Sequence, residues 1–289
     1  MGMKLIYLVL ALVSLNQAGA QTNSELGKDR FVEVGGGVTI HCLEKGEGPT
    51  LLFVPGWTMP AEIWEYQIRH FSHHYHVVAM DPRCQGSSTI TTNGLNPLAR
   101  AGDIKAVVER LKLGPAVLIG WSMGVAEAAA YVDQFGTKGI SAMVLVDGMA
   151  GFSLPPGTDP EEMQFLKQLR EDQSQFVDKF VRGMYRQPQS EEYLKRVIAA
   201  ALKTPAASAS ALMVSVFKQD RRAVLKRIDV PTLLAMSTIP QATREELQKS
   251  IKNSKLEVFD QAGHALFVDQ AARFNQVLEA FLKTNHIGK

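Results

Sequence analysis

The sequence lacks the features that mark several classes of protein. Its formal charge is only +2, with 31 Lys and Arg against 29 Asp and Glu and no long basic cluster, which argues against nucleic acid or another acidic polymer as a partner. Internal repeats and low-complexity tracts are absent, which excludes solenoids and repeat arrays. Beyond the first twenty residues no apolar run is long enough to span a bilayer, so we expect no stable membrane insertion.

Cysteine is also scarce, with Cys42 in an expected strand and Cys84 in the loop after another. A disulfide between them would need a Cα separation that a sequence does not supply. Because cysteine favours buried positions, we expect two free thiols.

The first distinctive feature that is present is a targeting pattern. Lys4 gives a positive start, residues 5–15 form a short apolar stretch, and Ala18-Gly19-Ala20 offers small residues at a cleavage point. We interpret residues 1–20 as a secretory signal peptide. The mature protein is then expected to begin near Gln21 and to be secreted or periplasmic.

From residue 31 onward, short β-rich runs alternate with helical segments. Four of the later runs are almost continuously apolar, as in strands buried on both faces of a parallel sheet. The alternation predicts an α/β fold with a mostly parallel, doubly wound, eight-stranded sheet. The expected strands are Phe31–Val34, Val38–Leu43, Thr50–Val54, His76–Met80, Ala116–Ile119, Ala142–Val146, Thr232–Met236 and Lys255–Phe259. The helices expected between them are Ala61–Phe71, Leu98–Leu111, Val125–Phe135, Thr243–Ile251 and Asp269–Lys283.

One interval departs from this alternation. Between Gly148 and Val230 the sequence shows helical segments and no good strand, and strands resume at Thr232. We therefore interpret residues 151–228 as a helical lid inserted into a core of residues 21–150 and 229–289, rather than as an independent helical domain. Such a lid would roof a pocket and exclude water from it.

The most informative stretch of the chain is Gly120-Trp121-Ser122-Met123-Gly124. An apolar strand precedes it and an alanine-rich helix follows, so Ser122 lies on a sharp strand-to-helix turn. Glycine is needed on both sides because side chains there would collide across the turn. The helix N-terminus behind Ser122 favours developing negative charge. This arrangement is typical of a nucleophile rather than of a serine in an ordinary turn.

A serine hydroxyl needs a base to take its proton, and the base needs a third group to orient it. His264 follows the last expected strand, on a loop at the carboxyl end of the sheet, where open α/β sheets bind ligands. We predict that His264 is the general base, the alternative being a surface histidine that caps a loop.

With these motifs the chain resembles the α/β-hydrolase superfamily over residues 31–283. The resemblance is to lidded single-domain members, which include esterases, lactonases and haloperoxidase-like enzymes. It rests on Val54-Pro55-Gly56-Trp57, Asp81-Pro82-Arg83-Cys84-Gln85-Gly86-Ser87-Ser88, the serine turn and Gly263-His264.

The resemblance implies an oxyanion hole made by the backbone N–H groups of Trp57 and Met123. It implies no metal and no organic cofactor. The side chains of Trp57 and Trp121 would line the substrate pocket, although Trp121 is equally explained as packing under the lid.

The chain departs from the family pattern in three places. Pro55 replaces the usual histidine before Gly56, and Cys84 stands where glycine is common. In most relatives an acid follows the strand that corresponds to Thr232–Met236, but residues 237–243 contain no carboxylate. Some relatives place the acid after the preceding strand, where this chain has Asp147. We predict Asp147 as the acid, with Glu245 and Glu246 as the alternatives.

Two further groups of polar residues invite a chemical interpretation. His70, His73, His74 and His76 resemble a metal cluster, but without a neighbouring carboxylate or thiol we expect a solvated loop. Asp81 and Arg83 are expected to fix a loop near the site rather than to react.

The sequence therefore predicts an exported serine hydrolase that cleaves carboxylic esters or lactones of small, mainly apolar substrates through an acyl-enzyme. The same triad would serve perhydrolysis, or amide or C–C bond hydrolysis. The non-enzymatic alternative is a hydrolase-derived ligand-binding protein. The acyl group, the alcohol and the oligomeric state are left open.

Overall fold

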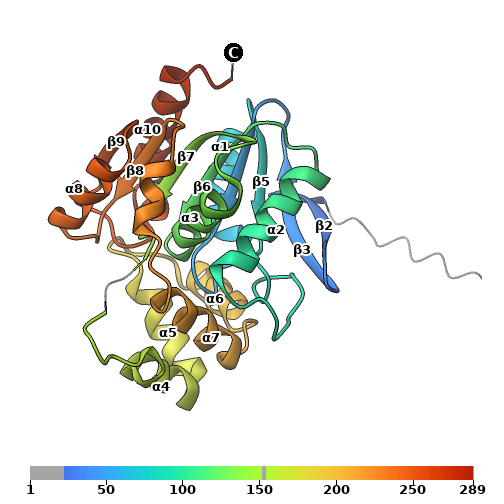
Figure 1. Cartoon of the computed structure of the whole chain (residues 1–289). Coiled ribbons are helices and arrows are strands. Elements are labelled where there is room, and N and C mark those ends of the chain that lie inside the picture. Colours follow the sequence, from blue (N-terminus) through green and yellow to red (C-terminus); the bar gives the residue numbers. More distant parts are fainter. Residues whose placement is uncertain (1–22, 152–153, 289) are drawn as a thin grey trace, which may run out of the picture.

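The computed structural model describes residues 23–151 and 154–288, so the expected signal peptide lies outside the described residues (Figure 1). Within them a single sheet has the strand order β1-β2-β3-β5-β4-β6-β7-β8-β9. All eight expected strands are present, and the two-residue β1 adds an antiparallel edge beside β2. The strands are β1 (Asn23–Ser24), β2 (Gly27–Gly35), β3 (Val38–Lys45), β4 (Thr50–Val54), β5 (His76–Met80), β6 (Ala116–Trp121), β7 (Ile140–Val146), β8 (Thr232–Met236) and β9 (Ser254–Val258).

The five pairings among β5, β4, β6, β7, β8 and β9 are all parallel, and β2 and β3 form the expected antiparallel hairpin. β4 lies between β5 and β6, so the chain leaves β4 on one side and later returns to its other side. This reversal creates a crevice at the carboxyl ends of β4 and β6, the position at which open α/β sheets bind ligands. The fold-class prediction is confirmed.

Both faces of the sheet are covered because alternate residues of its strands point to opposite sides. In β4, Leu51 and Phe53 join one apolar core, and Leu52 and Val54 join the other. The first core is closed by α1 (Glu65–Phe71), α9 (Leu266–Asp269) and α10 (Ala271–Thr284). The second is closed by α2 (Pro97–Arg110), α3 (Met123–Phe135) and α8 (Gln241–Ser250).

The helices between β7 and β8 form a layer of their own beyond one end of the strands (Figure 1). They are α4 (Gln164–Glu171), α5 (Gln173–Gly183), α6 (Glu191–Ala201) and α7 (Ala206–Phe217). Helices α4 and α5 are separate because the Asp172 side chain accepts from the Gln175 N–H and caps a new helix. Leu166, Leu169 and Leu212 of this layer pack with Trp57 and Met123 of the core.

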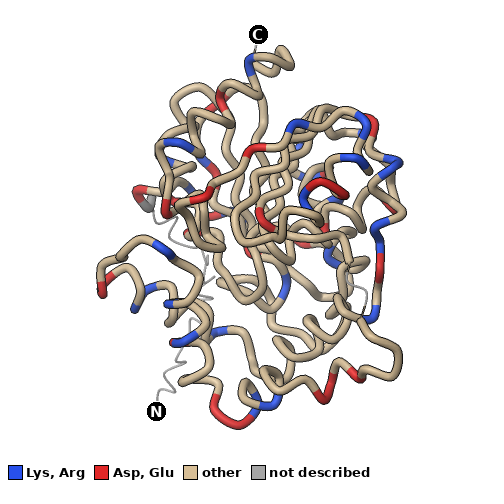
Figure 2. Tube along the Cα trace, turned by 90° about the vertical axis from the view of Figure 1, so that its left-hand side faces the viewer, with Lys and Arg blue, Asp and Glu red and all other residues tan. Residues whose placement is uncertain are grey.

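Along the described part of the tube, positions of Lys and Arg are interspersed with positions of Asp and Glu (Figure 2). Among the residues described, no single helix has the length and hydropathy of a membrane span. Helices α6 and α7 meet that test only as a pair, across a bend of 83°.

Candidate active site

Ser122 occupies a strained turn between β6 and α3. Its backbone lies at φ 55° and ψ −114°, a region that non-glycine residues rarely adopt. A Cβ on Gly120 would lie 2.5 Å from the Gly124 carbonyl oxygen, and a Cβ on Gly124 would lie 2.7 Å from that of Val54. Both glycines are therefore required for α3 to begin directly beside β4 and β6, with Ser122 at the bend.

The Ser122 side chain opens into a small apolar cavity of about 140 Å³. The walls come from the ends of β6, β7 and β8 and from α7 above them. The lining residues are Ser122, Met123, Ala126, Asp147, Gly148, Met149, Met213, Val216, Ile239 and His264. Three elements distant in sequence thus bring a hydroxyl, an imidazole and a carboxylate to one cavity.

The imidazole and the carboxylate are in direct contact. His264 Nδ1 lies 2.8 Å from Asp147 Oδ2. The Asp147 side chain is fully buried, whereas 26% of the His264 side chain is exposed. The two alternative acids, Glu245 and Glu246, lie exposed on α8. The structure therefore places Asp147, and neither glutamate, against the His264 ring.

The loop that lacks an acid instead supplies hydrogen-bond donors to Asp147. The N–H groups of Ser237 and Thr238 donate to Oδ1 over 2.7 and 3.0 Å, and the Thr238 hydroxyl donates to Oδ2 over 2.5 Å. Burial raises the pKa of Asp147, but the hydrogen bonds from His264, Thr238 and Ser237 outweigh burial and hold that pKa below its usual value. The sequence analysis missed this arrangement; the signal was the Ser-Thr pair at the vacant acid position.

The loop that carries His264 is anchored to the inserted helices. Asp269 Oδ2 accepts from the N–H groups of Gly263 and Arg186, each over 2.7 Å, and the Ala265 N–H donates to the Met184 carbonyl. Met184 and Arg186 directly follow α5. The position of the base therefore depends on how the end of α5 docks.

Trp121 does not line the cavity, contrary to one of the two expectations for it. Its ring is 1% exposed and packs edge-on against Trp64 and Phe267. Its Nε1–H donates to the His264 carbonyl over 2.9 Å. Because side chains alternate between the two faces of the sheet along β6, the Trp121 side chain points into the first apolar core. Through its hydrogen bond to the His264 carbonyl, Trp121 supports the His264 loop from that core.

Two backbone N–H groups near Ser122 are free to donate. Gly56 lies against Ser122, since a Cβ there would be 2.9 Å from the Ser122 Cβ, and this brings the next residue, Trp57, to the site. Within the described residues, neither the Trp57 N–H nor the Met123 N–H donates a hydrogen bond. These are the two donors that the sequence analysis assigned to an oxyanion.

The Trp57 side chain lies among the inserted helices. Its Nε1–H donates to the Ala209 carbonyl of α7 over 2.8 Å, and its ring meets Phe176 and Phe180 of α5 edge-on. It lines a neighbouring groove rather than the cavity at Ser122. The Trp57 ring therefore does not form the predicted wall of the cavity at Ser122; it lines the adjacent groove instead.

Asp81 and Arg83 fix the loop after β5, as predicted. Asp81 accepts from the N–H groups of Ala61 and Ser87, and Arg83 makes a two-point contact with Asp103. Cys84, the residue after Arg83, has φ 66°, a backbone conformation that favours the glycine expected at this position. Both cysteines are buried and free, which confirms that prediction.

The histidines between residues 70 and 76 contact different partners and do not converge on one point. His70 contacts Glu279 and His76 contacts Glu44, each over 2.8 Å. No group of three or more His, Cys, Asp or Glu side chains converges as metal ligands within residues 23–151 and 154–288.

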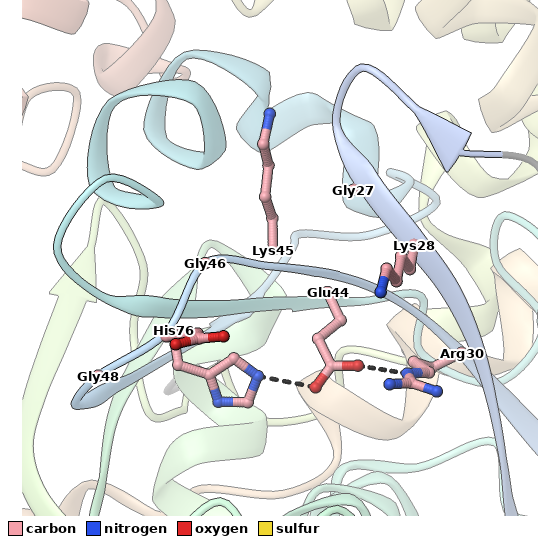
Figure 3. A pocket seen from close by; sticks show the side chains of 9 residues that line it. Gly27, Lys28, Arg30, Glu44, Lys45, Gly46, Gly48 and His76 are labelled. Carbon is pink, nitrogen blue, oxygen red and sulfur yellow. Dashed lines mark hydrogen bonds and ion pairs between the residues drawn. The ribbon is translucent and has the colours of Figure 1, made fainter.

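A separate hollow of about 670 Å³ surrounds Glu44, which lies between His76 and Arg30 (Figure 3). His76 begins β5, so this hollow is at the amino ends of the parallel strands, opposite Ser122. Burial raises the pKa of Glu44, but its hydrogen bonds to Arg30 and His76 keep it below the usual value. The hollow holds no group of the Ser122 site.

A hydroxyl, an imidazole paired with a buried carboxylate, and unpaired backbone N–H groups nearby form an arrangement that suits acyl transfer. In this structure Ser122 and His264 form no hydrogen bond, a contact that is often long or poorly aligned in free enzymes and tightens with substrate.

Comparison with known proteins agrees with the fold. The chain is 26% identical over 274 residues to a bifunctional esterase/perhydrolase of Acinetobacter calcoaceticus, covering 88% of this chain and 99% of that one. It is 27% identical over 260 residues to a non-heme chloroperoxidase of Streptomyces lividans, covering 82% and 93%. An esterase of Exiguobacterium antarcticum superposes with a TM-score of 0.82 at 24% identity, covering 88% and 98%. Residues 51–277 match the model of the alpha/beta hydrolase family, and the chain belongs to that family.

Proposed function

We propose that this chain is a serine hydrolase that cleaves carboxylic esters or lactones of small, mainly apolar compounds. The observation that carries the proposal is the meeting of Ser122 and the buried Asp147–His264 pair at one apolar cavity, with the unpaired backbone N–H groups of Met123 and Trp57 close to Ser122. The names of its relatives, esterase and esterase/perhydrolase among them, support the same chemistry.

In the proposed reaction His264 Nε2 removes the Ser122 proton as Oγ bonds to the substrate carbonyl carbon. The carbonyl π electrons move to oxygen, which accepts hydrogen bonds from the Trp57 and Met123 N–H groups. Asp147 holds the Nδ1–H and stabilises the imidazolium. When the tetrahedral intermediate collapses, His264 protonates the departing alcohol oxygen. Water then attacks the acyl-enzyme with the same base and releases the acid.

The inserted helices, residues 151–228, act in this proposal as a lid that excludes water from the acyl-enzyme. On the sequence of residues 1–20 alone we also propose that the protein is exported. N-terminal sequencing of the protein recovered from the periplasm or medium should begin near Gln21. An unprocessed protein that stays in the cytoplasm would contradict export.

The test of the reaction uses Ser122→Ala against short p-nitrophenyl esters and simple lactones. We expect the wild type to turn over and the variant to lose at least a thousandfold in kcat. Equal rates in the two proteins would overturn the proposal. If a fluorophosphonate labels Ser122 but no ester or lactone is hydrolysed, the alternative of a ligand-binding protein gains support.

A further inference from the structure

A second hollow adjoins the cavity at Ser122 on the side of the inserted helices. It is a groove of about 680 Å³ between α4, α5 and α7. Its floor is apolar, with Phe165, Phe176, Phe180 and Met213 all half-buried. The rings of Phe176 and Phe180 stack at 6.1 Å between centroids. Polar side chains form the rim: Gln164, Gln168, Glu171, Asp172, Gln175 and Lys179.

Two residues place this groove next to the reaction site. Met213 of α7 lines both hollows, so they are adjacent. The Trp57 side chain lines the groove, while its backbone N–H belongs to the proposed oxyanion hole. A ligand in the groove would therefore lie close to the carbonyl that Ser122 attacks.

The chemistry of the site decides which half of an ester each hollow receives. The leaving oxygen takes its proton from His264, so the alcohol half must lie on the His264 side of the carbonyl. His264 lines the small cavity and does not line the groove, whereas Trp57 lines the groove and does not line the cavity. The acyl half is thus directed past Trp57 into the groove.

The sizes of the hollows set limits on the two halves. A dry protein cavity of about 150 Å³ holds a molecule of the size of benzene, and the cavity at Ser122 measures about 140 Å³. An alcohol larger than this must either extend out of the cavity into solvent or displace Met213, Val216 or Ile239. The groove is several times larger and is walled by aromatic rings, which suits an extended acyl chain or one that ends in an aromatic ring.

We propose that the groove is an acyl subsite, and that the substrate class is esters of small alcohols with extended or aryl-terminated acids. This inference rests on the proposed function and deepens it. Lactones with a long side chain on the acyl side fall in the same class.

The decisive comparison uses two esters in which the same phenylbutyl carbon skeleton forms either the acid or the alcohol: methyl 4-phenylbutyrate and 4-phenylbutyl acetate. We expect the wild type to hydrolyse the methyl ester with a kcat/KM at least tenfold higher. Along methyl esters from acetate to hexanoate, kcat/KM should rise at each step. Equal values, or a preference for the phenylbutyl alcohol, would overturn the acyl assignment.

Phe176→Ala tests the groove itself, because this ring forms the floor without belonging to the proposed triad. The variant should lower the ratio of kcat/KM for methyl 4-phenylbutyrate to that for methyl acetate about tenfold. Phe135→Ala is the matched control: a half-buried phenylalanine on α3 that packs against Tyr131, away from the groove. An unchanged ratio in Phe176→Ala, or an equal drop in Phe135→Ala, would refute the subsite.

The failure of this inference is distinguishable from failure of the proposed function. Turnover with the opposite preference refutes the subsite and leaves the hydrolase. If the wild type hydrolyses no ester, titration calorimetry with 4-phenylbutyrate measures the groove directly. Binding that weakens about tenfold in Phe176→Ala supports the subsite without turnover, and the absence of binding to the wild type rejects it.

Discussion

A carboxylate at the end of β7 can serve His264 only if the surrounding backbone holds it in place. Asp147 is fully buried and has φ 40°, so both its desolvation and its backbone conformation cost free energy. Three hydrogen bonds from Ser237 and Thr238 offset this cost and leave Oδ2 aimed at the imidazole. The loop after β8 therefore acts as a support for an acid that lies on the neighbouring strand.

Replacing Thr238 should show how much this support matters. Thr238→Val keeps the volume and removes the hydroxyl, and we expect kcat to fall about tenfold, corresponding to one hydrogen bond of about 1.4 kcal/mol. KM should change little, and Thr238→Ser should recover most of the rate. For comparison, Asp147→Asn should lose several orders of magnitude. Full activity in Thr238→Val would show that the two backbone donors suffice.

His41 does not line the cavity at Ser122, but its side chain links β3 to Asp29 of β2 and to Asp81 after β5. Its Nδ1 lies 2.8 Å from Asp81 Oδ2 and its Nε2 lies 2.9 Å from Asp29 Oδ1. Burial lowers the pKa of His41, but its hydrogen bonds to Asp81 and Asp29 and their charges prevail and raise that pKa above 6.5. The charged form is therefore the one that the fold favours.

Because the folded-state pKa is raised, the stabilisation by His41 is fully present below pH 6.5 and is lost as pH rises through the raised value. We expect His41→Gln to lower the free energy of unfolding by about 1–3 kcal/mol at pH 5.5, with a smaller loss at pH 9. Urea denaturation of both proteins at the two pH values measures the difference. A loss that grows with pH would contradict the assignment.

At the scale of elements, the nucleophile depends on close contact between α3 and β4. Gly124 begins this contact, and a Cβ there would lie 2.7 Å from the Val54 oxygen and 3.1 Å from that of Pro55. Both neighbours are backbone atoms, which cannot rotate away. The helix would have to move, and Ser122 with it.

Gly124→Ala should therefore destabilise the protein by about 1–3 kcal/mol and reduce activity in the folded fraction. Gly102→Ala in α2 is the matched control, because a Cβ at Gly102 meets nothing within 4 Å. That variant should be neutral or more stable by about 0.5–1 kcal/mol, since alanine is the better helix former. Thermal melts and ester turnover give both comparisons; similar behaviour of the two variants would contradict this explanation.

At the scale of the whole molecule, the fold isolates both thiols from solvent. Cys42 of β3 is fully buried in the second apolar core, and burial raises the pKa of its thiol. Cys84 is 1% exposed, and its Sγ donates to the Thr91 carbonyl. Neither sulfur is available to an oxidant while the fold is intact.

We expect no thiol to react with Ellman's reagent in the native protein within minutes, and two to react once it is unfolded. Reducing agent should leave the melting temperature unchanged. Immediate reaction of one thiol in the native state, or a melting temperature that falls on reduction, would show that the cores are open or that a disulfide exists.

Local sequence was sufficient for the strands, most helices and the serine turn. Those features follow from patterns that short segments carry alone: continuous apolar runs for buried strands, and glycines two residues either side of Ser122. Order along the chain also placed His264 and Asp147 at the carboxyl edge of the sheet. Trp121 shows the limit, because the pattern around it did not reveal whether its ring faces the cavity or the core.

Only the tertiary structure decided the contacts between segments distant in sequence. Asp147 and Thr238 are 91 positions apart, and Trp57 and Ala209 are 152 apart, so no local pattern relates them. Side-chain direction at a strand end and the docking of helices depend on packing against neighbours that the sequence does not identify. The sequence by itself therefore determined the fold and predicted Ser122, His264 and Asp147 as the reacting groups, while packing decided how Asp147 is held and where the groove beside Trp57 lies.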